Sequence, residues 1–355
     1  MTIPNSPVIE CRHLWKIFGH RAEEALSAIQ SDGIGKTEVL ENYGCVIGVA
    51  DASFSVSEGE IFCIMGLSGS GKSTLIRHVN RLIEPTDGEI FIEGESISGL
   101  NARALRALRS QKIGMVFQNM ALMPHKTVRD NVAYALEVRG VKRQERLAVA
   151  AKAIETVELT GWGARYPDEL SGGMQQRVGL ARAIAADPRI LLMDEPFSAL
   201  DPLIRRQLQD QFLELASEMN KTTIFITHDL DEAIRIGNRI AIMKDGRLVQ
   251  IGTPEEIVTN PVDEYVTDFV AGISNLHLVH ASKIMIPFDA YQAANGGLVV
   301  DECLHASPDD DLDHLADLSS DTDHPIIIAE AGKPVGVVTK RALLRGIQGR
   351  LDQNA

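Results

Sequence analysis

Fully apolar runs alternate with segments of helical periodicity along most of this chain. The run Ile61–Met65 contains only apolar side chains, which is typical of a strand buried on both faces of a parallel sheet. Residues 190–193 form a second such run, and residues 222–227, rich in β-branched side chains, predict a further strand. Helical spacing follows the first run, at Leu75, Ile76, Val79, Leu82 and Ile83. The pattern predicts an α/β fold.

The N-terminal region predicts two further strands with an unusual connection. Residues 8–18 and 49–56 carry strand patterns, and the second alternates apolar with polar positions. Residues 19–48 between them are expected to form an insertion with a short helix at 22–29. A tolerated surface insertion is the simplest interpretation of this segment.

A mostly helical stretch is predicted at residues 119–187, after a strand at 113–117. Within it, one buried helical face is indicated by the spacing of Leu147, Ala151, Ile154 and Val157. Residues 239–251 predict a hairpin of two strands, because Asp245 and Gly246 form a sequence typical of a tight turn.

Composition restricts the classes of protein to which the chain can belong. Its 355 residues suggest two domains, and no apolar stretch approaches the roughly 20 residues that span a bilayer. Its cysteines lack CxxC spacing, so neither a zinc site nor a disulfide framework is indicated, and reduced cysteines in a cytosolic protein are expected. The net charge of −14 disfavours broad adhesion to nucleic acid or anionic lipid. Membrane association would therefore require protein partners.

A glycine-rich loop lies between the first apolar run and the helix that follows it. Glycines let the backbone N–H groups wrap around phosphates, and the helix N-terminus adds partial positive charge. This strand–loop–helix order distinguishes a nucleoside triphosphate site from an ordinary flexible turn. Lys72 would reach the β- and γ-phosphates, and the Ser73 hydroxyl would coordinate Mg²⁺. The expected ATP-binding residues of the loop are Gly66, Leu67, Ser68, Gly69, Ser70, Gly71, Lys72, Ser73 and Thr74.

Two carboxylates follow the second apolar run. Asp194 would help to hold Mg²⁺, and Glu195 would polarise the attacking water as general base. Because ligands in open α/β sheets lie beyond the carboxyl ends of the strands, these acids are expected to face the glycine-rich loop. Taken alone, acids after an apolar strand usually mark only the point where the chain reaches solvent.

A third motif, residues 170–177 with the sequence LSGGMQQR, resembles the signature of ABC-transporter ATPases. The family's other motifs occur in order, and the resemblance implies a P-loop ABC ATPase domain with a mixed sheet and a helical subdomain at about 119–187. It also implies roles for single residues. Gln118, in the Q-loop, would be a catalytic residue and a ligand of Mg²⁺, and His228 would be the switch histidine. Asp201 would belong to the D-loop, and Phe18 would be the aromatic residue that stacks on adenine. Trp15 is the weaker candidate for that stacking.

The signature residues are expected to bind the nucleotide of a second subunit. Ser171, Gly172 and Gly173 introduce a helix whose N-terminus could bind an anion, and Gln175 follows them. By resemblance, the signature of one copy completes the ATP site of the other, which predicts a symmetric homodimer with two ATP molecules. His228 would hydrogen-bond the γ-phosphate, whereas an isolated histidine at a strand end would more often be a solvated surface group.

A narrower resemblance is to the ATP-binding subunits of glycine betaine/proline importers. It covers residues 8–272 and rests on the insertion 19–48 and on residues 81–86, 121–125, 166–170, 197–205 and 228–235. It implies an ATPase coupled to transport, peripheral on the cytoplasmic face of the inner membrane, with integral permease subunits and a periplasmic or lipid-anchored substrate-binding protein. Residues 120–125 are expected to form the permease docking edge or, alternatively, part of the core. The transported osmolyte would be glycine betaine, proline, choline, carnitine or trimethylamine N-oxide.

The last part of the chain, residues 273–355, differs in composition. It carries 12 acidic against 6 basic side chains. Residues 325–344 resemble one repeat of a CBS regulatory domain, which implies a small α+β domain with an apparently single repeat. In ligand-binding repeats an acid commonly follows the threonine by three positions, whereas Ala342 stands there in this chain. A structural or ionic-strength-responsive role is therefore favoured over nucleotide sensing.

Three functions compete for the whole chain. The first is the importer ATPase. The second is a soluble ABC ATPase that acts on nucleic acid or ribosomes, but such relatives generally fuse two ATPase units or carry long coiled coils. The third is a regulator that binds ATP without cleaving it, which the general base Glu195 disfavours.

Overall fold

The computed structural model describes residues 7–271, 276, 278–295, 303–320, 322 and 324–348. The residues group by their contacts in space into two compact units, Met1–Ile251 and Gly252–Ala355. The boundary expected after Gly272 lies outside the described residues. Each unit encloses a hydrophobic core of its own.

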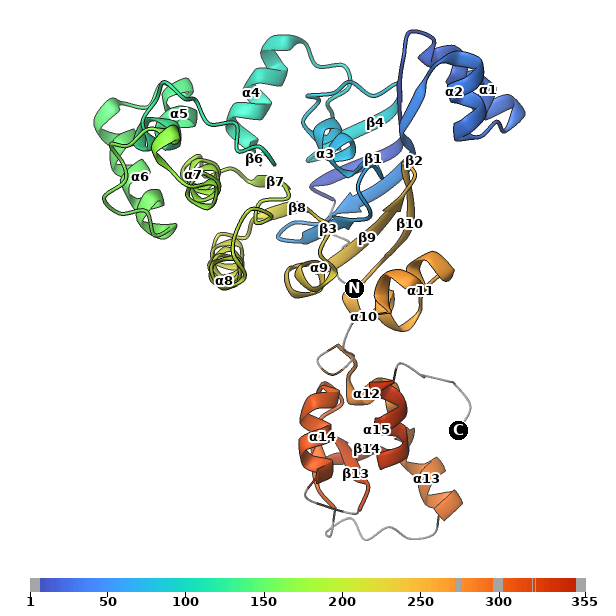
Figure 1. Cartoon of the computed structure of the whole chain (residues 1–355). Helices are drawn as coiled ribbons and strands as arrows, with labels where there is room; N and C mark the ends of the chain where they lie inside the picture. The colour runs from blue at the N-terminus through green and yellow to red at the C-terminus, as the bar shows by residue number, and fades with distance from the viewer. Residues whose placement is uncertain are drawn as a thin grey trace. The chain divides into compact units, whose positions relative to one another are not determined.

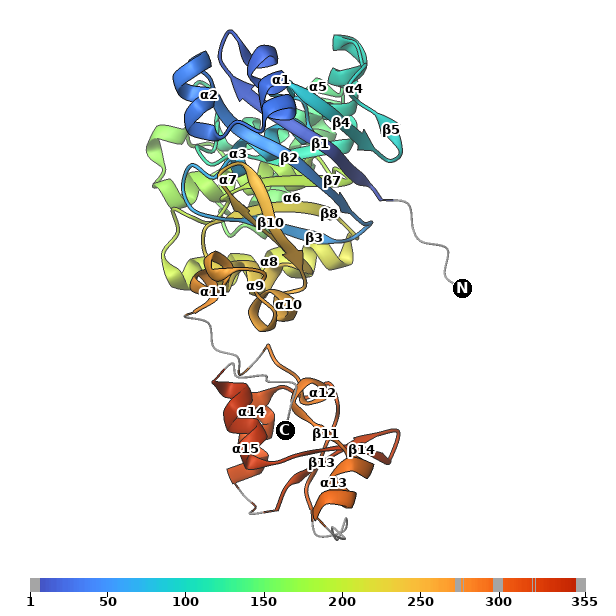
Figure 2. The ribbon, with the colours of Figure 1, turned by 90° about the vertical axis from the view of Figure 1, so that its right-hand side faces the viewer.

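The first sheet of the unit Met1–Ile251 has the strand order β2-β1-β4-β5. Strand β1 (Ile9–Phe18) pairs antiparallel with both β2 (Val46–Val56) and β4 (Asp87–Ile92), and β5 (Glu95–Ser96) forms the edge. Buried and exposed side chains alternate along the second half of β2, because one face of the sheet packs on the core. Figure 2 shows these strands in the upper part of the unit.

The second sheet has the strand order β10-β9-β3-β8-β7-β6. Strands β9, β3, β8, β7 and β6 run parallel to one another, and every side chain of β3, β7 and β8 is buried. The carboxyl ends of these strands therefore share one edge. The strands of this second sheet are β3 (Ile61–Met65), β6 (Ile113–Val116), β7 (Ile190–Asp194), β8 (Thr222–Thr227), β9 (Arg239–Lys244) and β10 (Arg247–Gly252).

A single hydrophobic core joins the two sheets. The rings of Phe54 on β2 and Phe62 on β3 stack with their centroids 5.2 Å apart. Leu75, Ile76 and Val79 of helix α3 (Lys72–Val79) enter the same core, as their helical spacing predicts. Helix α3 is thus fixed directly behind the glycine-rich loop.

Helices α5, α6 and α7 gather beside strands β6 and β7 (Figure 1). The prediction for α6 is partly wrong: Ile154 and Val157 are buried, but Ala151 is exposed, and Ala150 and Ala153 are buried in its place. Among the described residues, no helix is long and apolar enough to cross a bilayer. The helices of this unit, besides those of the insertion, are α3 (Lys72–Val79), α4 (Ala102–Lys112), α5 (Val128–Val138), α6 (Arg143–Thr156), α7 (Gly172–Ala185), α8 (Pro202–Glu218) and α9 (Leu230–Ile236).

The insertion folds as two helices, α1 (Ala22–Asp32) and α2 (Lys36–Tyr43). Each ends at a glycine with left-handed backbone, Gly33 and Gly44, which is the usual helix C-terminus. Side chains from α1, α2, β1 and β2 form a small core around Val39. The insertion is therefore a packed pair of helices. Helix α1 ends at Asp32 and is longer than the helix expected at residues 22–29.

The hairpin of β9 and β10 turns where the sequence predicts. Asp245 and Gly246 have φ of +49° and +85°, the sign that a type I′ turn requires at both central positions. The backbone of Gly246 accepts from Ala50 N at 2.8 Å and donates to Ser70 O at 2.9 Å. The turn thereby supports the glycine-rich loop.

The unit Gly252–Ala355 contains a four-stranded sheet of order β11-β14-β13-β12. Strands β13 and β14 form an antiparallel pair, and Ile326, Ile328 and Val338 pack with Leu312 and Leu315 of α14. Its elements are α10 (Pro254–Thr259), α11 (Glu264–Val270), α12 (Ala281–Ile284), β11 (Ile286–Pro287), α13 (Phe288–Asn295), β12 (His305–Ala306), α14 (Leu312–Ser320), β13 (Ile326–Glu330), β14 (Lys333–Val338) and α15 (Lys340–Ile347).

Candidate functional site

The glycine-rich loop connects the carboxyl end of β3 to the start of α3. Gly66, Gly69 and Gly71 have φ of +152°, +78° and +105°, a region that L side chains rarely adopt. A Cβ atom at Gly66 would clash with the carbonyl oxygen of Met243, and one at Gly71 with that of Gly48. Glycine is thus required at both positions by conformation and by space.

The Lys72 ammonium lies inside this loop. Its Nζ donates to the carbonyl oxygens of Gly66 at 2.8 Å and Leu67 at 3.1 Å. Burial lowers the pKa of Lys72, and the nearby carboxylates of Glu195 and Asp194 oppose that effect. A cation enclosed by backbone groups in this way suits the phosphates of a nucleotide.

The Ser70 hydroxyl gives an independent indication of an anionic ligand. Its Oγ is buried and has no hydrogen-bond partner among the described residues. A buried hydroxyl without a partner is costly, and a phosphate oxygen would supply the missing partner. The loop therefore fits the triphosphate that its sequence predicts.

Ser73, in the first turn of α3, meets Asp194, the last residue of β7. Ser73 Oγ donates to Asp194 Oδ1 at 2.8 Å, and Arg77 Nη2 lies 3.3 Å from Asp194 Oδ2. Asp194 is completely buried, so these two contacts compensate for the desolvation of its charge. A hydroxyl and a carboxylate side by side are oxygen ligands of the kind that Mg²⁺ prefers.

Two side chains converge on one carboxylate oxygen of Glu195, and all three residues follow neighbouring strands. Gln118 follows β6, Glu195 follows β7 and His228 follows β8. Gln118 Nε2 donates to Glu195 Oε2 at 3.3 Å, and His228 Nδ1 lies 3.3 Å from the same oxygen. The backbone of Glu195 has φ of +50°, and its N–H donates to Ile226 O. This strained backbone turns the carboxylate toward the other two groups.

Phe18 and Trp15 differ in their surroundings. The Phe18 side chain is 42% exposed and lies against Gly48, where an added Cβ would come within 2.6 Å of the ring. Trp15 is buried in the small core of the insertion and is covered by Arg247. Lys16 Nζ lies 5.2 Å from the centroid of the Phe18 ring, but this ring still exposes surface on which a base can stack, whereas the buried ring of Trp15 does not.

The signature motif forms the N-terminus of α7. Ser171 caps the helix, since its Oγ accepts from Met174 N at 3.3 Å, and a Cβ at Gly172 would meet nothing within 4 Å. Gln175 donates to the carbonyl oxygens of Pro167 and Leu170, so its side chain is engaged within its own loop. The described partners of Gln175 thus lie in its own subunit.

Two polar residues of this region escaped the sequence analysis. Arg77 lies one helical turn after Ser73, a spacing that places both on the face of α3 toward Asp194. Gln176 is buried and bonds to Ser198 and Ala199, in the D-loop that ends at Asp201, the N-cap of α8. The helical period was a usable signal for Arg77, but the contact of Gln176 depends on the tertiary fold.

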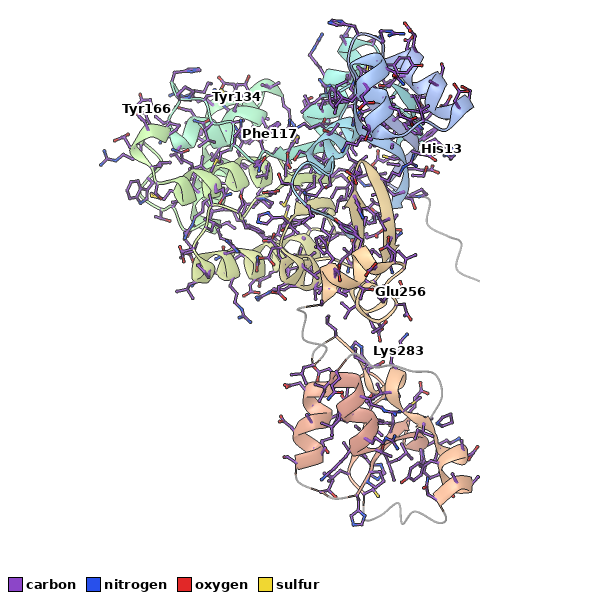
Figure 3. The ribbon with its side chains drawn as sticks, turned by 45° about the vertical axis from the view of Figure 1, so that its right-hand side comes forward. His13, Phe117, Tyr134, Tyr166, Glu256 and Lys283 are labelled. Atoms are coloured by element: carbon purple, nitrogen blue, oxygen red, sulfur yellow. The ribbon has the colours of Figure 1, made fainter. Side chains whose placement is uncertain are left out.

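A groove of about 430 Å³ lies where the helical subdomain meets β6. Its lining is mostly apolar and comes from α4, β6, α5, α7 and the segment after Gln118. Of the expected docking residues 120–125, Ala121 and Met123 line it. Phe117 and Tyr134, both labelled in Figure 3, line it as well. We call this feature the subdomain groove.

Comparison with known proteins gives consistent matches. Residues 49–198 match the family model described as ABC transporter. The glycine betaine/carnitine transport ATP-binding protein GbuA of Listeria monocytogenes is 55% identical over 278 residues, which cover 78% of this chain and 70% of that protein. The glycine betaine transport ATP-binding protein OpuAA of Bacillus subtilis is 44% identical in an alignment of 396 positions. This alignment covers 98% of this chain and 94% of that protein.

Solved structures agree with these relatives. A dimeric ATP-binding cassette in a post-hydrolysis state, bound to ADP and Pi, is 30% identical to this chain with a TM-score of 0.60. The match covers 69% of this chain and 98% of that structure.

Proposed function

The chain belongs to the ATP-binding subunits of ABC transporters for glycine betaine and related osmolytes, and from that premise we propose how its residues energise import. It is an ATPase subunit, and the competing assignment to nucleic acid or ribosomes has no counterpart among the relatives described above. The observation that carries the catalytic part of the proposal is the convergence of Gln118, Glu195 and His228 beside the Lys72 loop.

Each side chain has a chemical task in this proposal. Lys72 and the loop N–H groups bind the phosphates, and Phe18 stacks on the adenine. Glu195 accepts a proton from the attacking water, and His228 donates a hydrogen bond to the γ-phosphate. The positions of Lys72, Glu195 and His228 after β3, β7 and β8, along one edge of the second sheet, support these assignments, and Phe18 ends β1 of the first sheet.

Mg²⁺ is the proposed cofactor, with Ser73, Asp194 and Gln118 as its protein ligands. The short contact between Ser73 Oγ and Asp194 Oδ1 supports two of these ligands. Bound there, the ion would neutralise charge on the phosphate oxygens. Arg77 also contacts this carboxylate, because its Nη2 lies 3.3 Å from Asp194 Oδ2.

The working form proposed is a homodimer that encloses two ATP molecules. Ser171, Gly172 and Gly173, with Gln175 behind them, would close the site built around Lys72 of the other copy. The dimeric state of the matched ATP-binding cassette supports this arrangement. The same residues are exposed or half-buried at the start of α7 in the single chain.

Permease subunits and a periplasmic or lipid-anchored binding protein are the proposed partners. The subunit would be peripheral on the cytoplasmic face of the inner membrane, held there by the permease. The subdomain groove, with its apolar lining and exposed Val138, fits an apolar helix face of that permease. The solute would be a quaternary amine or related osmolyte and would be selected by the partners.

Val138→Lys tests the docking proposal. Because a lysine in the subdomain groove would oppose the apolar helix face, we expect uptake of glycine betaine by the intact transporter to fall by about tenfold or more. ATP hydrolysis by the isolated chain should stay within about twofold, since Val138 is remote from Glu195 in sequence and fold. Uptake is measured with the intact transporter in proteoliposomes, and ATP hydrolysis by the isolated chain is measured in solution.

The matched control is Val149→Lys, on the exposed surface of α6 and outside the groove lining. Uptake by this variant should equal that of the parent. Normal uptake by Val138→Lys would contradict the proposal that the permease docks in the subdomain groove. The assignment as an ATPase would be unaffected.

The domain at 273–355 is proposed to be one CBS-like repeat with a structural or ionic-strength-responsive role. Its β13–β14 pair followed by α15 supports this likeness, and Thr339 caps α15 by accepting from Ala342 N at 3.1 Å. Ending the chain at residue 272 should leave ATP hydrolysis intact but remove its dependence on salt in the permease complex. A salt titration identical to that of the full chain would contradict this role.

A further inference from the structure

The turn that carries Gln118 has an unusual backbone. Met120 N donates to Phe117 O at 2.9 Å, which closes the turn around Gln118. Met120 and Ala121 then have φ of +54° and +46°. Two consecutive L residues with left-handed backbone are strained, because each Cβ approaches a carbonyl oxygen. Neither residue is a glycine or asparagine, so something outside the turn must hold this conformation.

Arg182 of α7 contacts both strained residues. Its Nη2 donates to Met120 O at 2.6 Å and its Nη1 to Ala121 O at 2.7 Å. Hydrogen bonds from a guanidinium are among the strongest in proteins, and its fixed fork matches two adjacent carbonyls. Gly179, one turn earlier on α7, faces Met120, and a Cβ there would be 4.0 Å from it. The turn is therefore seated on the signature helix.

The same turn borders two functional regions. On one side Gln118 reaches Glu195 through its Nε2. On the other side Ala121 and Arg182 themselves line the subdomain groove, next to Phe117. The turn therefore lies between the subdomain groove and Gln118.

We propose that Arg182 is a positioning residue that holds Met120 and Ala121 in the left-handed conformation and so keeps Gln118 beside Glu195. This inference rests on the catalytic role proposed above for Gln118. Without the two hydrogen bonds, Met120 and Ala121 relax to negative φ, and the chain between them and β6 shifts Gln118 away. The Lys72 loop is not part of this turn, so the contacts of that loop with the phosphates do not depend on Arg182.

Arg182→Met removes both donors and keeps most of the side-chain volume. We expect kcat for ATP hydrolysis to fall by about tenfold, with KM and the dissociation constant for ATP unchanged. Arg182→Lys, which retains one donor group, should give an intermediate loss and serves as the second variant if Arg182→Met folds poorly. Steady-state ATPase assays and equilibrium ATP binding measure both quantities.

Arg139→Met is the matched control. Arg139 also donates to two carbonyl oxygens, those of Ser110 and Ala186, close to the same groove. Its partners lie outside the turn of Gln118. We expect kcat of this variant within about twofold of the parent.

Glycine rescue separates positioning from general packing. Glycine adopts positive φ without strain, so replacing Met120 and Ala121 by glycine in the Arg182→Met background should restore kcat to within about threefold of the parent. A merely structural role of Arg182 predicts no recovery.

Two results would overturn the inference: a kcat of Arg182→Met within twofold of the parent, or a loss that the glycine pair does not relieve. Gln118→Ala is measured in parallel. If that variant turns over normally, the catalytic role of Gln118 fails and this inference fails with it. If Gln118→Ala is slow while Arg182→Met is normal, the role of Gln118 stands and only the role of Arg182 is rejected.

Discussion

Glu195→Gln should lower the rate of ATP hydrolysis by about 10² to 10⁴ while leaving ATP binding intact. The amide keeps the size of the side chain but cannot accept the proton of the attacking water. Lys72, Ser73 and Asp194 are unchanged, so the dissociation constant for ATP should stay within a few-fold. Single-turnover hydrolysis and equilibrium binding on the same preparation measure the two effects.

Glu155→Gln is the control for this substitution, since Glu155 is an exposed residue of α6. Its hydrolysis rate should match that of the parent. If Glu195→Gln turned over at a normal rate, the general base would have to be another group, and the convergence of Gln118 and His228 on this carboxylate would have no catalytic meaning.

A mixture of Lys72→Met and Ser171→Arg subunits should hydrolyse ATP although neither variant does so alone. In a mixed dimer one site carries both lesions, and the other combines an intact Lys72 loop with an intact signature. With random pairing, half of the dimers are mixed and each has one working site. We therefore expect recovery of about a quarter of the parental rate if the two sites act independently.

The measurement is ATP hydrolysis after the two variants are co-refolded or exchanged, compared with each variant at the same total concentration. Mixing either variant with itself is the control. No recovery in a preparation shown to contain mixed dimers would mean that Ser171 does not serve the Lys72 site of its partner.

The sequence predicted those parts of the site that depend on local backbone. Strand, loop and helix around Lys72 followed from an apolar run, glycines and helical spacing, each a short-range signal. The turn at Asp245 and Gly246 also has its predicted position, because the required positive φ values leave few choices of residue. The apolar run at residues 190–193 likewise placed Asp194 at the end of a buried strand.

Contacts between distant segments were not predictable in the same way. The position of β8 between β3 and β7, which brings His228 to Glu195, is a property of the sheet order and leaves no local signal. Ala150 and Ala151 have the same side chain, so periodicity could not decide which of them faces the core. The left-handed backbone of Met120 and Ala121 is imposed by Arg182, from another helix, without the glycine that usually marks it.

The two contacts on Glu195 bear on the direction from which water is activated. Gln118 and His228 both approach Oε2, and among the described residues no hydrogen bond reaches Oε1. The two oxygens of the carboxylate are therefore inequivalent. Oε2 is held by two contacts, whereas the syn and anti lone pairs of Oε1 can each accept a proton. Proton transfer from water should therefore end on Oε1, which places the attacking water on the side of the carboxylate away from Gln118 and His228.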